Sequence, residues 1–455
     1  MADRYDDDYE EDYDNDIDTR RLARHRRRVR NQIIAYIVLL ILLVAIGFGI
    51  YKAVSFAIGY FKANKPATTV SENQVTVSEN EPGVLVSPDV IENDVVSEND
   101  VPETTEAKEE NAQARAYVDS MSLEQKVANL FIVTPEDITG VTTATQAGEG
   151  TRSALATYAV GGLIYDRKNI EGSDQLKALT TNTQNMYNEL YNSDVFIIVR
   201  EEGAVNTIAD SYASVVPQDS AAVIGESGNA SNAYTAYVTI GNYLAEYGVN
   251  LNLGPVCNVI TVDGSILGDR SFGTDPSEVS LMVGRAVDGQ MEMNVNTCLT
   301  SFPGYGSVTA DPANGSVSTD MSKDELIANE YATFMSGINA GAQFIQVSDI
   351  IASNITGEDV PCVFSTVIIN DIIRGELGFE GVIITEPMNY KAITDYYGAG
   401  EAAVMAINAG CDMILLSSDF SSAYTAVYEA VQNGEISEER LDEALMRIYT
   451  VKFSE

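Results

Sequence analysis

Carboxylates are the side chains of this 455-residue chain that are best placed to do chemistry. Several of them follow short apolar runs, where a buried strand would end: Asp166, Glu202, Asp311, Asp349 and Glu386. Two carboxyl groups on either side of a glycosidic bond can hydrolyse it, because one protonates the leaving oxygen while the other attacks or activates water. The alternative explanation is that the loops of a very acidic protein collect carboxylates by chance.

The elements that must position these groups can be found as apolar runs bounded by turn residues. Eight runs fit, at 129–133, 162–165, 195–199, 249–253, 295–299, 344–347, 381–385 and 412–416. Stretches with helical periodicity separate most of them, and this alternation predicts a parallel sheet. Eight repeats in about 340 residues favour a (β/α)8 barrel, whose site lies at the carboxyl ends of the strands. A doubly wound open sheet is the alternative.

The composition limits the classes of partner and cofactor. The formal net charge is −40, with 67 acidic and 27 basic residues, which argues against nucleic acid as a partner. The single histidine is His25, and there is no tryptophan. The four cysteines do not have the spacing of a zinc site, so we expect buried thiols, with disulfides as the alternative. No cofactor is implied.

The first 112 residues predict three segments that precede the globular part. Residues 1–32 form an acidic head that ends in an arginine-rich stretch, with seven arginines between Arg20 and Arg30. Residues 33–61 begin with an uncharged apolar run that predicts a membrane-spanning signal-anchor helix rather than a cleaved signal peptide. The arginines predict a cytoplasmic N-terminus and an extracytoplasmic globular part at 113–455. Residues 62–112, with three VSEN repeats, predict a disordered acidic linker.

The globular part resembles the N-terminal barrel domain of glycoside hydrolase family 3, and in particular its bacterial β-N-acetylhexosaminidases. The similarity covers nearly all of residues 117–453, with the motifs in order. The strings that carry it are MSLEQKVANLF (121–131), GGLIYDRKNI (161–170), LNLGPVCNV (251–259), ILGDRSFGTDP (266–276), FPGYG (302–306) and LGFEGVIITEPM (377–388). The resemblance implies a TIM-type barrel and, for the family, hydrolysis of terminal N-acetylglucosamine bonds in cell-wall glycans.

At most positions that do chemistry, the sequence departs from the pattern that the resemblance implies. The nucleophilic Asp is Glu386, and the longer side chain moves the carboxylate by about 1 Å, a displacement that can cost about 100-fold in rate. The acid/base His is Ala313, although the Asp of that loop is retained as Asp311. The other substituted positions are Arg200 for Asp, Ala204 for Gly, Val205 for Arg, Asn258 for Asp, Thr300-Ser301 for Lys-His, and Tyr305 and Asp349 for His.

Three hypotheses follow from this comparison. The first is a catalytically degenerate barrel that is anchored in the membrane and binds a cell-wall glycan or an envelope protein. The second is an active glycosidase with Glu386 as nucleophile and Asp311, Asp349 or Glu202 as acid. The third is a hard-cation site at which Glu201 and other carboxylates converge.

The residues predicted to contact a substrate are Arg270, Glu202, Asp349, Tyr305 and Asp166. Arg270 is the residue of the family's substrate-binding set that is retained. An alternative structural role for Arg270 is an ion pair with Asp269, Glu202 or Asp275.

Overall fold

The structure is a computed structural model that describes residues 105–416 and 418–454. The predicted head, the anchor helix at 33–61 and most of the predicted linker lie outside these residues. Within the described ranges, none of the helices is both long enough and apolar enough to cross a membrane. Helix α2 begins at Thr105, inside the segment predicted as linker, so helical structure starts before the predicted boundary at residue 113.

Eight strands form one parallel sheet in the order β7-β6-β5-β4-β3-β2-β1-β8. A parallel bridge between Ile384 and Met413 joins the β7 and β8 segments, which lie at the two ends of this order. The prediction of a (β/α)8 barrel is therefore confirmed, and the open-sheet alternative is wrong. The strands are β1 (Phe131–Val133), β2 (Gly162–Ile164), β3 (Phe196–Val199), β4 (Leu251–Asn252), β5 (Asn296–Phe302), β6 (Phe344–Val347), β7 (Val382–Thr385) and β8 (Ile414–Leu416).

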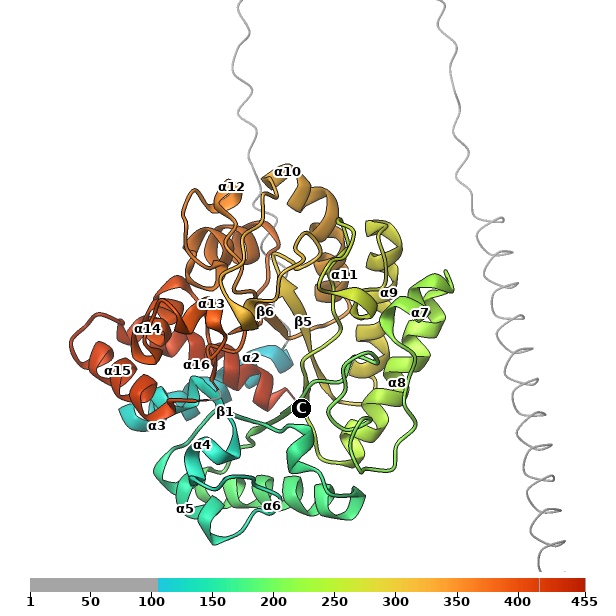
Figure 1. Cartoon of the computed structure of the whole chain (residues 1–455). Coiled ribbons are helices and arrows are strands. Elements are labelled where there is room, and N and C mark those ends of the chain that lie inside the picture. Colours follow the sequence, from blue (N-terminus) through green and yellow to red (C-terminus); the bar gives the residue numbers. More distant parts are fainter. Residues whose placement is uncertain (1–104, 417, 455) are drawn as a thin grey trace, which may run out of the picture. The chain divides into compact units, whose positions relative to one another are not determined.

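Helices surround the strands (Figure 1). The α-helices of the described residues are α2 (Thr105–Ser120), α3 (Leu123–Asn129), α4 (Pro135–Thr139), α5 (Glu149–Thr157), α6 (Ser173–Tyr191), α7 (Ala221–Glu226), α8 (Ala230–Glu246), α9 (Pro276–Met291), α10 (Lys323–Leu326), α11 (Ala332–Asn339), α12 (Ser353–Thr356), α13 (Lys391–Thr394), α14 (Ala399–Ala409), α15 (Phe420–Gln432) and α16 (Glu438–Phe453). Short 3₁₀-helices are η1 (Arg167–Asn169), η2 (Gly268–Arg270), η3 (Pro312–Asn314) and η5 (Cys362–Phe364), and π-helical turns are η4 (Ile327–Tyr331) and η6 (Val367–Glu376).

Local sequence explains why these elements form where they do. Every residue of β3 and β7 is buried, as expected for strands covered by helices outside and by packed side chains inside the barrel. Ser122 and Thr134 begin α3 and α4 with reciprocal capping boxes, which satisfy the free N–H groups of the first turn. The four cysteines are free and buried, which confirms the prediction of buried thiols.

An ion cluster fastens the amino-terminal ends of β7 and β8. The Asp412 carboxylate is fully buried and accepts hydrogen bonds from Arg374 of η6 (2.6 Å) and from Arg440 (3.1 Å) and Arg447 (3.0 Å) of α16. It also accepts the backbone N–H of Ile383 in β7 at 2.9 Å. One carboxylate therefore ties two strands and two helices together at the end of the barrel opposite the candidate site.

Candidate functional site

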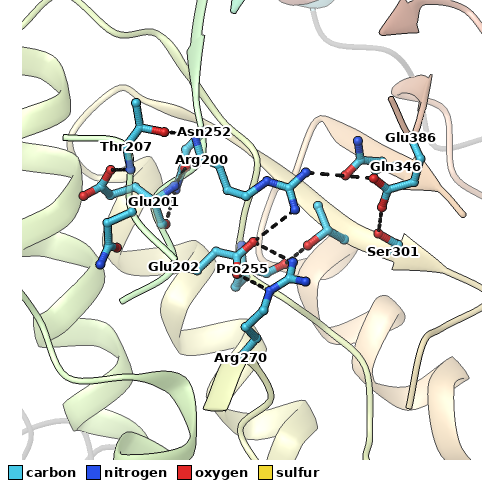
Figure 2. Close-up of polar contacts among 12 residues, drawn as sticks. Arg200, Glu201, Glu202, Thr207, Asn252, Pro255, Arg270, Ser301, Gln346 and Glu386 are labelled. Atoms are coloured by element: carbon cyan, nitrogen blue, oxygen red, sulfur yellow. Dashed lines mark hydrogen bonds and ion pairs between the residues drawn. The ribbon is translucent and has the colours of Figure 1, made fainter. Parts of the chain in front are cut away.

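Glu386 follows β7 at the carboxyl end of the barrel and is held by two neighbours. The hydroxyl of Ser301, in β5, donates a hydrogen bond to Oε1 of Glu386. The guanidinium of Arg200, which follows β3, lies with Nη2 3.9 Å from Oε2 of Glu386 (Figure 2). Glu386 is only 3% exposed, so its carboxyl group has little contact with solvent.

A second arginine, Arg270, is connected to Glu386 through Glu202 and Arg200. Arg270, in η2, donates two hydrogen bonds to the buried Glu202 carboxylate, from Nε at 2.7 Å and from Nη2 at 3.0 Å. Nη1 of Arg200 lies 3.5 Å from the same carboxylate, so Arg200 is placed between Glu202 and Glu386 (Figure 2). The structural alternative for Arg270, an ion pair with Glu202, is therefore found. Arg270 and Glu202, predicted as substrate contacts, bind each other.

The surroundings raise the pKa of the Glu386 carboxyl above its ordinary value. Burial is the largest cause, because a carboxylate loses its hydration there. Three contacts lower the pKa of Glu386: the positive charge of Arg200, the hydrogen bond from Ser301 and the charge of Arg270. The negative charge of Glu202 raises this pKa further. The protonated form of Glu386 is therefore favoured more than in a solvated glutamate.

Asp349, which follows β6, is a second buried carboxyl group in this region. Its pKa is raised well above the ordinary value, first by burial and then by the charge of Glu386. Neither of its carboxyl oxygens has a hydrogen-bond partner among the described residues. Its backbone N–H donates to the hydroxyl of Tyr305 at 3.3 Å, and Tyr305 is itself buried. The structure thus brings the predicted residues Asp349, Tyr305 and Glu386 into one buried region.

Asp311, the other predicted catalytic residue, has a structural contact. Its side chain is exposed and accepts the backbone N–H of Ala313 at 2.8 Å, which caps the short helix η3. The alanine at position 313 offers no group that could exchange a proton. The loop after β5 therefore supplies one exposed carboxylate, Asp311, which caps a short helix.

Asn258 holds the end of β5 and the start of the loop that follows it. Its side-chain oxygen accepts the backbone N–H groups of Ser301 and Tyr305, both at 3.3 Å. Its side-chain nitrogen donates to the Ser301 carbonyl at 2.9 Å and to Glu330 at 3.2 Å. Glu330 lies in the π-turn η4, and burial raises its pKa to about 8. The end of β5, which carries Ser301, is thus connected through Asn258 to a buried acid in η4.

The hard-cation alternative requires the carboxylate oxygens of four residues to converge on one point: Glu201, Glu202, Asp349 and Glu386. The carboxylate of Glu201 instead accepts the backbone N–H groups of Thr207, Ile208 and Ala209 and the hydroxyl of Tyr243. Within the described residues, no group of three or more histidine, cysteine, aspartate or glutamate side chains is arranged to hold a metal ion. Glu201 serves to shape the loop after β3.

A pocket of about 370 Å³ opens at the carboxyl ends of the strands. Of the predicted site residues in the described ranges, Asp166 alone lines it, while Glu386 lies behind Arg200 and outside the lining. The lining consists of Thr134, Ile164, Tyr165, Asp166, Arg167, Arg200, Val205, Asn206, Thr207, Pro387, Asn389, Tyr390 and Leu415. These residues follow strands β1, β2, β3, β7 and β8 or lie in them, as a barrel site requires.

Two residues of the site were given no role by the sequence analysis. Arg200 was expected at the end of the third strand and was identified as a substituted position, but its ion pairs with Glu202 and Glu386 were not expected. Tyr390 lines the pocket four residues after Glu386, and its pKa is raised to about 12, first by burial and then by the charge of Glu386. Nothing in the sequence distinguishes Tyr390 from the other 23 of the 24 tyrosines except its place after a strand.

Comparisons with known proteins agree with this architecture. A solved β-N-acetylglucosaminidase of glycoside hydrolase family 3 from Paenibacillus sp. is 29% identical with a TM-score of 0.69, and the match covers 73% of this chain and 62% of that one. A solved β-N-acetylhexosaminidase from Beutenbergia cavernae is 27% identical with a TM-score of 0.65, covering 73% of this chain and 99% of that one.

Sequence comparison gives the same family. A β-hexosaminidase from Tolumonas auensis is 28% identical over 289 residues, which are 62% of this chain and 82% of that protein. The family model described as the glycosyl hydrolase family 3 N-terminal domain matches residues 122–451. The model covers well over half of the chain, and the chain therefore belongs to glycosyl hydrolase family 3, with a barrel of the β-hexosaminidase type.

Proposed function

We propose that this β-hexosaminidase-like barrel binds a cell-wall glycan and does not hydrolyse it. The observation that carries the proposal is the state of Glu386, the residue at the family's nucleophile position. Its carboxyl group is buried, hydrogen-bonded to Ser301 and paired with Arg200, and its pKa is raised. A nucleophile must be ionised and must reach the sugar carbon. Burial works against ionisation of Glu386, and the contacts with Ser301 and Arg200 hold its carboxyl group away from a ligand in the pocket.

The loop after β5 supports the same proposal. In the retaining reaction a second group must protonate the leaving oxygen. Asp311 is exposed and caps η3, and Ala313 has no acidic proton. The pocket nevertheless retains the chemistry of a sugar site, because Tyr390 offers an aromatic ring and Asn206, Asn389 and Asp166 offer hydrogen-bonding groups.

A second candidate function, hydrolysis with Glu386 as nucleophile and Asp349 as acid, is favoured by one observation. Asp349 is buried and its carboxyl oxygens have no partner among the described residues, so burial raises its pKa and favours its protonated form. A carboxylic acid that stays protonated at neutral pH is what a general acid requires.

Two substrates distinguish the candidates on the full-length chain. The 4-methylumbelliferyl and 2,4-dinitrophenyl N-acetyl-β-glucosaminides differ in how much they need a general acid, because dinitrophenolate leaves without protonation. We expect no turnover of either substrate, and binding of N-acetylglucosamine oligosaccharides by calorimetry. Turnover that is lost in Glu386→Gln and Asp349→Asn would establish the second candidate instead. Turnover of the dinitrophenyl substrate alone would show that only the acid is missing.

The proposal includes a location at the outer face of the cytoplasmic membrane. It is supported by the apolar run that begins at Ile33 and by the arginines that precede it. We expect a protease added to intact cells to release the barrel by cleavage within 62–112, while an epitope at the N-terminus stays protected until the cells are opened. Protection of the barrel in intact cells would contradict this location.

A further inference from the structure

The charges around the pocket are unusual for a chain with a formal net charge of −40. Two arginines, Arg167 and Arg200, line the pocket, and Asp166 is the acid among the lining residues. Arg167 is 61% exposed and pairs with the half-exposed Asp210 at 3.1 Å. Arg200 is 20% exposed and lies deeper, beside Glu386 and Glu202. A ligand in this pocket therefore meets two guanidinium groups, of which Arg167 is exposed and Arg200 is largely buried.

The two arginines that contact Glu202 use their donors differently. Arg270 forms two hydrogen bonds with Glu202, at 2.7 and 3.0 Å. The contacts of Arg200 with Glu202 and Glu386 are 3.5 and 3.9 Å long and are ion pairs rather than hydrogen bonds. A guanidinium carries five N–H donors in a planar fork. Arg270 thus satisfies Glu202, and the Arg200 fork retains donors on the side of the pocket.

The charge balance of these four residues also leaves room for an anion. Arg200 and Arg270 carry two positive charges, and Glu202 and Glu386 carry two negative charges only when both are ionised. Whenever Glu386 holds its proton, two guanidinium groups face one carboxylate, and burial shifts Glu386 in that direction. A carboxylate in the pocket would restore the balance, and arginine binds carboxylates with two parallel hydrogen bonds.

Building on the proposed glycan binding, we propose that Arg200 makes this pocket selective for a sugar that carries a carboxylate. The shared chemistry is the carboxylate on a pyranose ring. Its carbon can be C6 itself, as in a uronic acid, or it can belong to a lactyl ether at O3, as in N-acetylmuramic acid. Arg167, at the exposed side of the pocket, adds attraction at longer range.

The experiment uses titration calorimetry on the full-length chain in detergent at low salt. N-acetylmuramic acid is compared with N-acetylglucosamine, from which it differs by an O3 lactyl ether that carries the carboxylate. Methyl β-glucuronide is compared with methyl β-glucoside, from which it differs by the carboxylate at C6. We expect the acidic member of at least one pair to bind about tenfold more tightly, since a charged hydrogen-bonded pair is worth more than a neutral one. The pair that discriminates identifies where the carboxylate is attached, and added salt should reduce the ratio.

Two variants and one control assign the selectivity to Arg200. Arg200→Gln should reduce the ratio of affinities to less than about twofold, since it removes the charge. Arg200→Lys keeps the charge but loses the planar fork, and it should give an intermediate ratio. Arg285→Gln makes the same charge change on α9, where Arg285 pairs with Asp288 and is not part of the pocket lining, and it should keep the wild-type ratio. Thermal unfolding shows whether each variant is folded. If Arg200→Gln does not fold, the ratio of affinities in Arg200→Lys decides the test.

The outcomes separate this inference from the proposed function. Equal binding of the acidic and neutral members of both pairs would overturn the selectivity and leave glycan binding in place. A tenfold ratio that persists in both Arg200 variants would also overturn it. If no sugar of either pair binds, the selectivity fails, and the calorimetry with N-acetylglucosamine oligosaccharides decides the proposed glycan binding separately.

Discussion

The guanidinium of Arg200 lies 3.9 Å from the carboxyl group of Glu386, so a cation stands beside the residue at the family's nucleophile position. Arg200 follows β3 and Glu386 follows β7, and the barrel brings them together across the carboxyl ends of its strands. The same arginine lines the pocket, whereas Glu386 lies behind it. Of these two residues, Arg200 is therefore the one that a ligand in the pocket meets.

Tyr390 should contribute to glycan binding through its ring. The Tyr390→Ala variant removes the one aromatic ring that the loop after β7 gives to the pocket, and we expect binding of N-acetylglucosamine oligosaccharides to weaken about tenfold, in line with the value of aromatic contacts. Tyr396→Ala is the matched control, because Tyr396 is 65% exposed, lies in the following segment and does not line the pocket. Calorimetry measures both, and equal affinities of the two variants would contradict a role for Tyr390.

Glu330 should make the stability of the fold depend on pH. Burial raises its pKa from 4.5 to about 8, so between these values the folded chain holds a proton that the unfolded chain has released. Rising pH then lowers the free energy of unfolding through this group, by about 1.4 kcal/mol per pH unit at most. Urea unfolding across that range should show a shallower decline in Glu330→Gln than in the wild type. Parallel curves would show that Glu330 is not the group responsible.

Removal of the Asp412 charge should be strongly destabilising. Asp412→Asn leaves Arg374, Arg440 and Arg447 close together around a neutral side chain, and loss of one partner from a buried ion cluster costs about 3–5 kcal/mol. Asp288→Asn is the control, because its ion pair with Arg285 is exposed and such pairs contribute at most about 1 kcal/mol. Urea unfolding gives both values, and similar losses in the two variants would refute the structural role of Asp412.

The positions of the strands follow directly from the sequence. All eight predicted runs contain the observed strands or overlap them, because a strand buried on both faces needs a continuous apolar run between turn residues. The predicted run 249–253 contains only a two-residue strand, Leu251–Asn252. The π-helical turns at 327–331 and 367–376 were not expected, because one extra residue in a helical turn leaves no pattern that a sequence reader can see.

The site was less predictable than the strands. The order of the chain placed Glu202, Asp349 and Glu386 at strand ends, and the barrel does bring them to one region. The sequence could not reveal that the Glu201 carboxylate accepts the backbone N–H of Thr207, or that Asp311 caps η3, because both contacts depend on the path of a loop. Which of several adjacent polar residues faces inward is decided by loop geometry and by competition for hydrogen bonds.

The ion cluster at Asp412 separates the requirements of folding from those of ligand recognition. It fastens β7 and β8 at their amino-terminal ends, while the pocket residues lie at their carboxyl ends. The residues that hold these two strands together are therefore not the residues that line the pocket. Stability and ligand choice can change separately in such a barrel, because a substitution in the pocket lining does not remove a contact of the Asp412 cluster.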